Sequence, residues 1–258
     1  MNVAAKIKDP VFARVAQGWE PHVEASGPFR GLHGGAVSGL LAAVLEERAR
    51  EEDWGRPLTA SVLILRPAPL EILQTRIELL RAGGRVAMAE ASLLAGGKLI
   101  AKASACFAKP LDLPELARAE AAPAPIDPSS LEIWNGRGRP DRTTFFDALD
   151  IRDNGEGIKW GRMKRPIVEF EAPFATLFAF ADNGTPYWLS GTEFWPPPWG
   201  FPNIDVTVHV SRPPEGAWVG VEPSSDRRRE GLGLTESRLY DETGPLGRAC
   251  QTVVVTPR

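Results

Sequence analysis

The sequence has little cysteine and little histidine, which limits the metal and redox chemistry it can carry. Of its 258 residues, two are cysteine and three are histidine. Cys106 and Cys250 show neither a zinc-site spacing nor the clustered set of a disulfide framework, so both are expected to be reduced thiols in a cytoplasmic protein. Three scattered histidines argue against a histidine-based metal site, and no metal is expected.

The sequence also lacks an excess of positive charge and any long apolar run. The formal net charge is −3 and the isoelectric point is near 5.8. A mildly acidic chain is unsuited to general nucleic-acid binding and to a polybasic membrane anchor. No apolar run approaches the roughly 18 to 20 residues of a membrane span, and residues 1–16 lack the shape of a signal peptide. We therefore expect a cytoplasmic protein without nucleic-acid or membrane partners.

The most distinctive stretch runs from Gly31 to Leu45, and it is apolar and rich in small residues. The pattern predicts a helix that continues to about Arg50 and is buried on all sides. Gly34 and Gly35 fall at its first turn, where bare backbone N–H groups make a site for developing negative charge. A plain buried helix with glycines for close packing is an equally good interpretation of this stretch alone.

One order of elements occurs twice along the chain. Extended runs separated by turn residues follow the first helix, and they predict strands over 58–66, 70–81, 85–94 and 98–108. A second apolar helix is predicted over 173–181, with later strands within 201–212, 217–223, 231–240 and 247–257. Arg-Pro recurs at 66–67 and 212–213, an offset of 212 − 66 = 146. The pattern predicts two units, 1–112 and 141–258, joined by a proline-rich linker over 113–140.

Three motifs in sequence order carry a family resemblance. They are FRGLHGGAV from Phe29, PNIDVTVHVSRPP from Pro202, and GLGLTESRLYD from Gly231 with GRACQ closing at Gln251. Together they make the chain similar to the double hotdog acyl-CoA thioesterases, related to the bacterial acyl-CoA thioesterase II group. The resemblance implies an α+β tandem hotdog, with two antiparallel sheets each wrapped round a long central helix. It also implies hydrolysis of an acyl-CoA thioester, a cytoplasmic role in lipid metabolism, and, by analogy, a homodimer.

The resemblance further implies the residues of a site. Asp182, Gln251 and Asn203 would hold and activate a water, with no cofactor beyond the coenzyme A of the substrate. The family carries a serine or threonine where this chain has Asn203, whose amide can still bind a water; Asp205 close by is an alternative. The backbone N–H groups of Gly34 and Gly35 would hold the oxyanion, with His33 beside them.

The first half lacks the acid of a second site. Single-domain hotdog enzymes carry a carboxylate at the position that is Ala42 here, and Gln251 corresponds to Ala105 at the 146-residue offset. Because the glycine turn of one hotdog unit faces the acid of the other, the resemblance implies one active site per chain. The reciprocal site, with Ala42 and Ala105, is expected to be inactive.

Other interpretations stay open from the sequence. Asp182 could be a solvated helix end, Gln251 an inward-facing strand residue, and His33 a structural histidine. The chain could also be a non-catalytic acyl-CoA-binding protein or a hotdog enoyl-CoA hydratase or dehydratase, although no hydratase motif is found. Two weaker signals are the aromatic, proline-rich residues 188–201, a candidate acyl-pocket wall, and Arg227 to Arg229, a candidate phosphate site or a solvated face.

Overall fold

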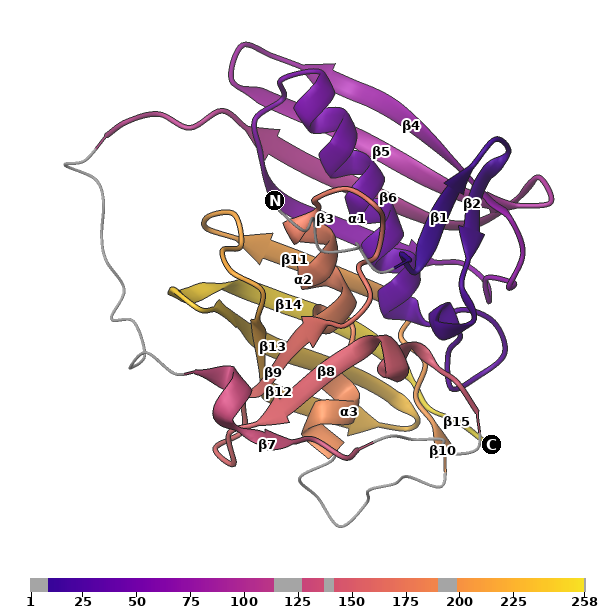
Figure 1. Cartoon of the computed structure of the whole chain (residues 1–258), viewed down its shortest axis with the longest axis vertical. Coiled ribbons are helices and arrows are strands. Elements are labelled where there is room, and N and C mark those ends of the chain that lie inside the picture. The colour runs from indigo at the N-terminus through magenta and orange to yellow at the C-terminus, as the bar shows by residue number, and fades with distance from the viewer. Residues whose placement is uncertain (1–8, 114–126, 137–141, 190–198, 258) are drawn as a thin grey trace, which may run out of the picture.

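One continuous antiparallel sheet organises the molecule (Figure 1). The computed structural model describes residues 9–113, 127–136, 142–189 and 199–257. Thirteen strands follow the order β1-β2-β4-β5-β6-β3-β11-β14-β13-β12-β9-β8-β7, and β10 pairs with β15 in a separate two-stranded sheet. The prediction of two separate sheets, one in each half, is therefore wrong, because the two halves share one sheet.

The predicted helix and four strands of the first half form, with β6 at the expected bounds, and three short elements precede them. Its elements are β1 (Phe12–Val15), β2 (Gly18–Pro21), η1 (Val23–Ala25), α1 (Gly34–Glu51), β3 (Arg56–Ile64), β4 (Leu73–Ala82), β5 (Val86–Ala95) and β6 (Lys98–Ala108). Buried positions alternate along β5 and β6, which places one face of the sheet against α1.

The second half repeats this plan with shorter helices and more strands. Its elements are η3 (Pro128–Ser130), β7 (Glu132–Ile133), η4 (Phe145–Ala148), β8 (Leu149–Asp153), β9 (Lys159–Met163), α2 (Pro173–Ala181), α3 (Gly184–Leu189), β10 (Trp199–Gly200), β11 (Asp205–Val210), β12 (Val219–Arg229), β13 (Leu232–Asp241), β14 (Gly244–Val254) and β15 (Thr256–Pro257). The 3-10 turn η4 leads directly into β8.

The seam between the halves is the pairing of β3 with β11. These strands run antiparallel, with Val62 opposite Val206 and Ala60 opposite Val208. All four side chains are buried, so the seam is part of the hydrophobic core. A strand at the edge of a sheet leaves a row of unpaired backbone groups, and pairing the two edges satisfies both rows at once.

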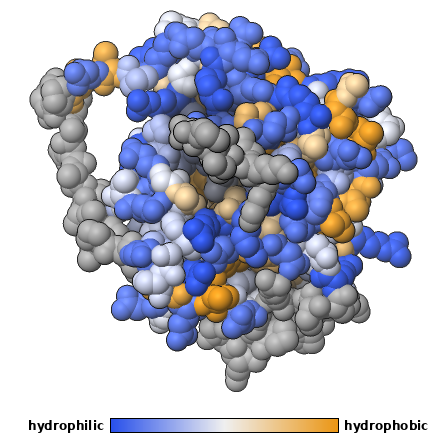
Figure 2. Space-filling view, viewed as in Figure 1, coloured by the Kyte–Doolittle hydropathy of each residue, from blue (hydrophilic) through white to orange (hydrophobic). Residues whose placement is uncertain are grey.

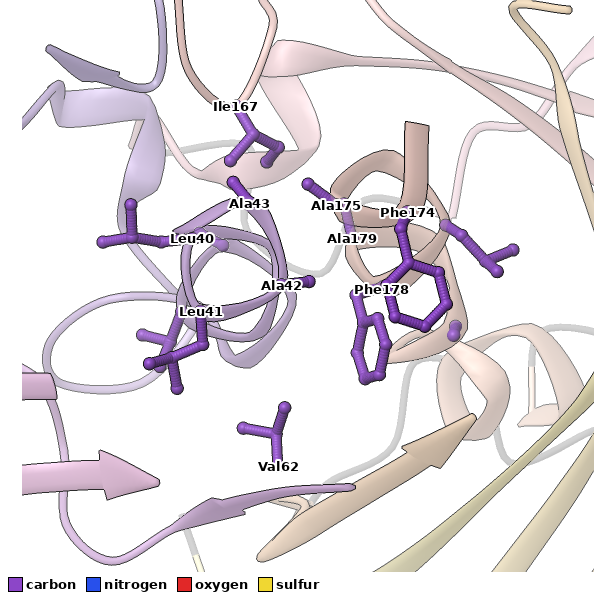
Figure 3. Close-up of a cluster of buried hydrophobic side chains, with 14 of the residues drawn as sticks. Leu40, Leu41, Ala42, Ala43, Val62, Ile167, Phe174, Ala175, Phe178 and Ala179 are labelled. Carbon is purple, nitrogen blue, oxygen red and sulfur yellow. The ribbon is translucent and has the colours of Figure 1, made fainter. Parts of the chain in front are cut away.

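The two main helices lie side by side over this seam (Figure 3). Ala42 of α1 points toward Phe178 and Ala179 of α2, Ala43 points toward Ile167, and Val62 of the sheet lies below. Small side chains on both helices permit this close approach. A long central helix in each half is not what the structure shows, because α2 ends after 9 residues and α3 adds only 6.

Some sequence predictions concern parts of the chain that lie outside the described residues. They include most of the linker (114–126 and 137–141) and the centre of the aromatic segment (190–198). Among the described residues, no helix is long and apolar enough to cross a membrane. The face seen in Figure 2 is largely hydrophilic, with apolar side chains in scattered groups.

Candidate active site

The turn before α1 brings His33 and the glycine pair into a fixed position. Gly31 has φ +91°, and a Cβ there would lie 2.3 Å from the Ala68 carbonyl oxygen, so only glycine suits this close approach. Leu32 N–H donates to that same carbonyl at 2.8 Å. His33 then caps the helix, because its Nδ1 accepts the Gly35 N–H at 3.0 Å.

Asp182 of the second half faces this turn. It is the C-terminal cap of α2 and is only 4% exposed. A Cβ added to Gly34 would lie 2.8 Å from its Oδ1 and 2.9 Å from its Oδ2, so the carboxylate packs directly against the bare Gly34 Cα. The sequence predicted this meeting of the glycine turn and the acid, although the two lie 182 − 34 = 148 residues apart.

Asn203 binds the same aspartate from the other side. Its Nδ2 donates to the Asp182 carbonyl at 2.9 Å and to Oδ1 at 3.2 Å. Its Oδ1 is buried and has no hydrogen-bond partner among the described residues. An amide with a free acceptor beside a carboxylate can accept a hydrogen bond from a small polar molecule such as water.

His33 and Asp182 form a buried, closely coupled pair. Nδ1 of His33 lies 3.4 Å from Oδ2 of Asp182. Since Nδ1 accepts the Gly35 N–H, the imidazole in this arrangement carries its proton on Nε2 and is neutral. Burial lowers the pKa of His33, and the Asp182 charge offsets only part of that. Burial also raises the pKa of Asp182, although the Asn203 amide and the Gly35 N–H favour its ionised form, as does His33 when it is protonated.

These groups line a cavity of about 510 Å³. His33, Gly34, Asp182 and Asn203 form its polar end. Most of the remaining wall is apolar and includes Val37, Ile64, Leu65, Phe146, Pro186, Phe201, Pro202 and Ile204. A mostly apolar cleft with a few convergent polar groups is the usual form of a small-molecule site.

Gln251 lies elsewhere in the structure. It is 1% exposed and is not among the residues that line this cavity. Its Oε1 is 2.8 Å from the position of a Cβ added to Gly184, so its amide lies against the start of α3, two residues beyond Asp182. Neither amide atom has a hydrogen-bond partner within the described residues.

The other positions that the sequence singled out lie outside the polar end of this cavity or are already hydrogen-bonded, with Gly34 as the exception. Ala42 and Ala105 are both buried in the apolar core. Asp205, the alternative to Asn203, accepts the Thr252 N–H at 2.8 Å and is not in the cavity wall. Gly35 N–H is already bonded to His33, whereas Gly34 N–H donates to no group in the described part of the chain.

Sequence reasoning missed the aromatic residues that hold His33. Its ring centroid lies 5.1 Å from that of Phe145 and 5.4 Å from that of Phe146. Both phenylalanines belong to η4, a short turn that no hydrophobic periodicity indicates. The Phe145-Phe146 pair after Thr143-Thr144 was the available signal, since Thr144 and Asp147 form a capping box there.

Solved structures with the same architecture define the class of protein. A protein of unknown function with a hotdog fold from Alicyclobacillus acidocaldarius matches with TM-score 0.71 and 16% identity, covering 93% of this chain and 92% of that one. A candidate thioesterase from Novosphingobium aromaticivorans matches with TM-score 0.71 and 19% identity, covering 95% and 98%. An acyl-CoA thioesterase II from Mycobacterium marinum matches with TM-score 0.66 and 17% identity, covering 88% and 90%. The chain is thus a hotdog-fold protein.

Sequence-family models then identify the family. The model for the acyl-CoA thioesterase N-terminal domain matches residues 24–108, and the model for the C-terminal domain matches residues 110–255. The chain belongs to this acyl-CoA thioesterase family and is a thioester hydrolase, as the motifs predicted. No curated protein is similar enough in sequence to count as a match.

Proposed function

We propose that this protein hydrolyses an acyl-CoA thioester to a free acid and coenzyme A by direct attack of a water that Asp182 activates. The observation that carries the proposal is the buried Asp182 carboxylate, which lies against Gly34 at the polar end of an apolar cavity. The apolar wall suits an acyl chain, and the family supplies the reaction class. The proposed setting is the cytoplasm.

The roles follow from the chemistry of thioester hydrolysis. An ionised Asp182 takes a proton from the water as its oxygen attacks the thioester carbon. The free acceptor of Asn203 receives the other O–H and orients the water. The carbonyl oxygen becomes an oxyanion, for which the unbonded Gly34 N–H at the start of α1 is the nearest donor. Collapse of the tetrahedral intermediate then releases the coenzyme A thiolate.

His33 and Gly35 support this arrangement. His33 uses Nδ1 to hold Gly35, so the first turn of α1 stays in the shape that exposes Gly34 N–H. Because the imidazole is neutral, it adds no positive charge that would make the Asp182 carboxylate a weaker base. We therefore assign to His33 and Gly35 the role of shaping the first turn of α1, which binds the oxyanion. Asp182 is the proton acceptor.

Gln251 is proposed to act through the segment that carries Asp182. Its amide lies against Gly184 and has two atoms without described partners, which is unusual for a buried glutamine. The family resemblance still predicts that Gln251 binds the catalytic water directly. The position of its amide against Gly184 supports a second role, in which Gln251 fixes the point at which α2 ends and α3 begins.

Three proposals concern the larger organisation of the chain. The division into units 1–112 and 141–258 with a linker at 113–140 is supported by the repeated order of helix and strands. A homodimer rests on analogy with other hotdog proteins. One active site per chain is supported by the apolar surroundings of Ala42 and Ala105.

A thiol-release assay over acyl-CoA chain lengths tests the function. Asp182→Asn keeps the size of the side chain and removes its basicity, so kcat should fall by about 10² to 10⁴. Asp112→Asn, an exposed position outside the cavity, is the matched control. Wild-type turnover in Asp182→Asn would refute the mechanism. Tight acyl-CoA binding without turnover in the wild type would favour a binding protein, and water addition to an enoyl-CoA would favour a hydratase.

A further inference from the structure

A second cavity adjoins the first across the turn before α1. Its volume is about 620 Å³, and Arg142 and Thr143 are among the residues that line it. The two cavities share five lining residues: Gly27, Phe29, Arg30, Pro67 and Ala68. Phe29 and Arg30, both exposed, therefore lie at the boundary between the two cavities.

Positive charge gathers around these two cavities. Arg30 lines both of them, Arg66 lines the first and Arg142 lines the second. Among the described residues that line the two cavities, the buried Asp182 is the only one with a carboxylate. The whole chain carries a net charge of −3, so three arginines against one buried acid is a local feature and does not follow from composition.

Two of these arginines have defined backbone partners, and one does not. Arg66 donates to the Leu99 carbonyl. Arg142 Nη2 donates to the carbonyls of Gly27, Pro28 and Phe29, and so holds the turn that separates the cavities. Arg30 is exposed and makes no hydrogen bond or ion pair with any described residue. A guanidinium without a partner at the meeting point of two cavities is available for an anionic ligand.

We propose that the second cavity binds the phosphate-bearing nucleotide end of coenzyme A, with Arg30 as its main phosphate ligand and Arg142 as a second one. This inference rests on the proposed function, which places the thioester beside Asp182. The pantetheine arm then runs along the shared wall at Phe29 and Arg30, and the phosphates reach the arginines. Guanidinium groups bind phosphate through paired N–H donors. Val23 and Leu70, both half-exposed, add an apolar surface for the base.

Steady-state kinetics with two substrates test the proposal. One substrate is an acyl-CoA, and the other is the same acyl group on N-acetylcysteamine, which has a thioester but no phosphate. Arg30→Ala should raise KM for the acyl-CoA about tenfold, as expected for one exposed charge-assisted hydrogen bond, with kcat unchanged. The loss in kcat/KM should be about tenfold larger for the acyl-CoA than for the N-acetylcysteamine thioester. Arg76→Ala, an exposed arginine on β4 outside both cavities, is the control and should change neither.

Several results would overturn the proposal. An unchanged KM for the acyl-CoA in Arg30→Ala would do so, and so would an equal loss with both substrates, which would indicate a distorted site. A tenfold effect of Arg229→Ala in place of Arg30→Ala would move the phosphate site to the arginine run on β12. Calorimetric titration with coenzyme A itself separates this proposal from the proposed function. If coenzyme A binding depends on Arg30 but no turnover occurs, the nucleotide site is supported and the proposed hydrolysis mechanism is rejected. If turnover occurs and neither binding nor KM depends on Arg30, the mechanism is supported and the nucleotide site is rejected.

Discussion

Glu46 couples the two halves of the molecule, and its removal gives a prediction with a defined size. It lies on α1, is 9% exposed, and its Oε2 accepts the Phe174 N–H at 3.1 Å. The residue that should cap α2, Ala172, has no side chain able to do so. Glu46 therefore caps α2 from the neighbouring helix, and α2 carries Asp182 at its other end. Glu46→Gln keeps an oxygen that can accept the N–H and removes the charge.

The magnitude follows from the pKa of Glu46. Burial raises this pKa from 4.5 to about 7, although Arg50 and the backbone N–H groups of α2 favour the ionised form. Between these two values the native state holds a proton that the unfolded state has lost, so stability falls as pH rises. A difference of about 2.5 pKa units corresponds to about 3 kcal/mol. The stabilising contribution is complete below pH 4.5 and is lost by the time the pH exceeds about 7.

Urea denaturation of both proteins from pH 4 to pH 8 measures the effect. The free energy of unfolding of the wild type, minus that of Glu46→Gln, should fall by about 3 kcal/mol over this range. Taking the difference cancels the other titrating groups, since both proteins share them. Two parallel stability curves would show that Glu46 titrates normally and would refute the argument from burial. Glu46→Ala, which removes the cap as well, should be less stable than Glu46→Gln at every pH, by about 1 kcal/mol.

Three further predictions concern particular contacts. Gly34→Ala places a Cβ 2.8 Å from Asp182 Oδ1 and should lower kcat about 100-fold in the thiol-release assay, whereas Gly84→Ala, with no atom within 4 Å of its added Cβ, should not. Arg212→Ala removes the only positive charge bound to the buried Asp241 carboxylate, which Arg212 binds at 2.6 Å and which keeps only the hydrogen bonds from Glu215 and Thr243 among the described residues. It should lower the free energy of unfolding by about 3 kcal/mol in denaturation. Arg212→Lys should recover part of that, and equal loss in both would argue against the two-point contact. Gln251→Leu should keep the free energy of unfolding within about 1 kcal/mol, because no described partner is lost, while kcat falls at least about tenfold; full activity would remove Gln251 from the mechanism.

Local sequence patterns determined most of the individual elements. The apolar, small-residue run after His33 forms α1, and the run over 173–181 forms α2 at the predicted bounds. Strands bounded by glycine turns, such as β6 after Gly96-Gly97, form where alternation and turn residues indicate them. These features depend on residues close in sequence, whose spacing sets which face is apolar and where the chain can turn.

The family resemblance also named residues that the fold places close together. The resemblance paired the glycine turn at Gly34 with Asp182, and the two are in contact. It also included Asn203, which binds Asp182 with its amide. Gly34 and Asn203 fall within short motifs, whereas Asp182 is assigned from its place at the end of the second apolar helix. Gln251 also falls within a motif, but its side chain lies against Gly184 at the start of α3. The strand pattern does not show which neighbour its amide contacts.

The remaining features depend on contacts between residues far apart in the chain. The halves share one sheet because β3 and β11 have complementary edges and buried valines opposite each other, which a repeat in the sequence cannot reveal. Phe145 and Phe146 enclose His33 from a turn more than 100 residues away. Arg30 and Arg142 both line the second cavity, although they are far apart in the sequence. Hydrogen-bonding edges, side-chain packing and the local balance of charge exist only once distant segments are in contact, so only the folded chain determines them.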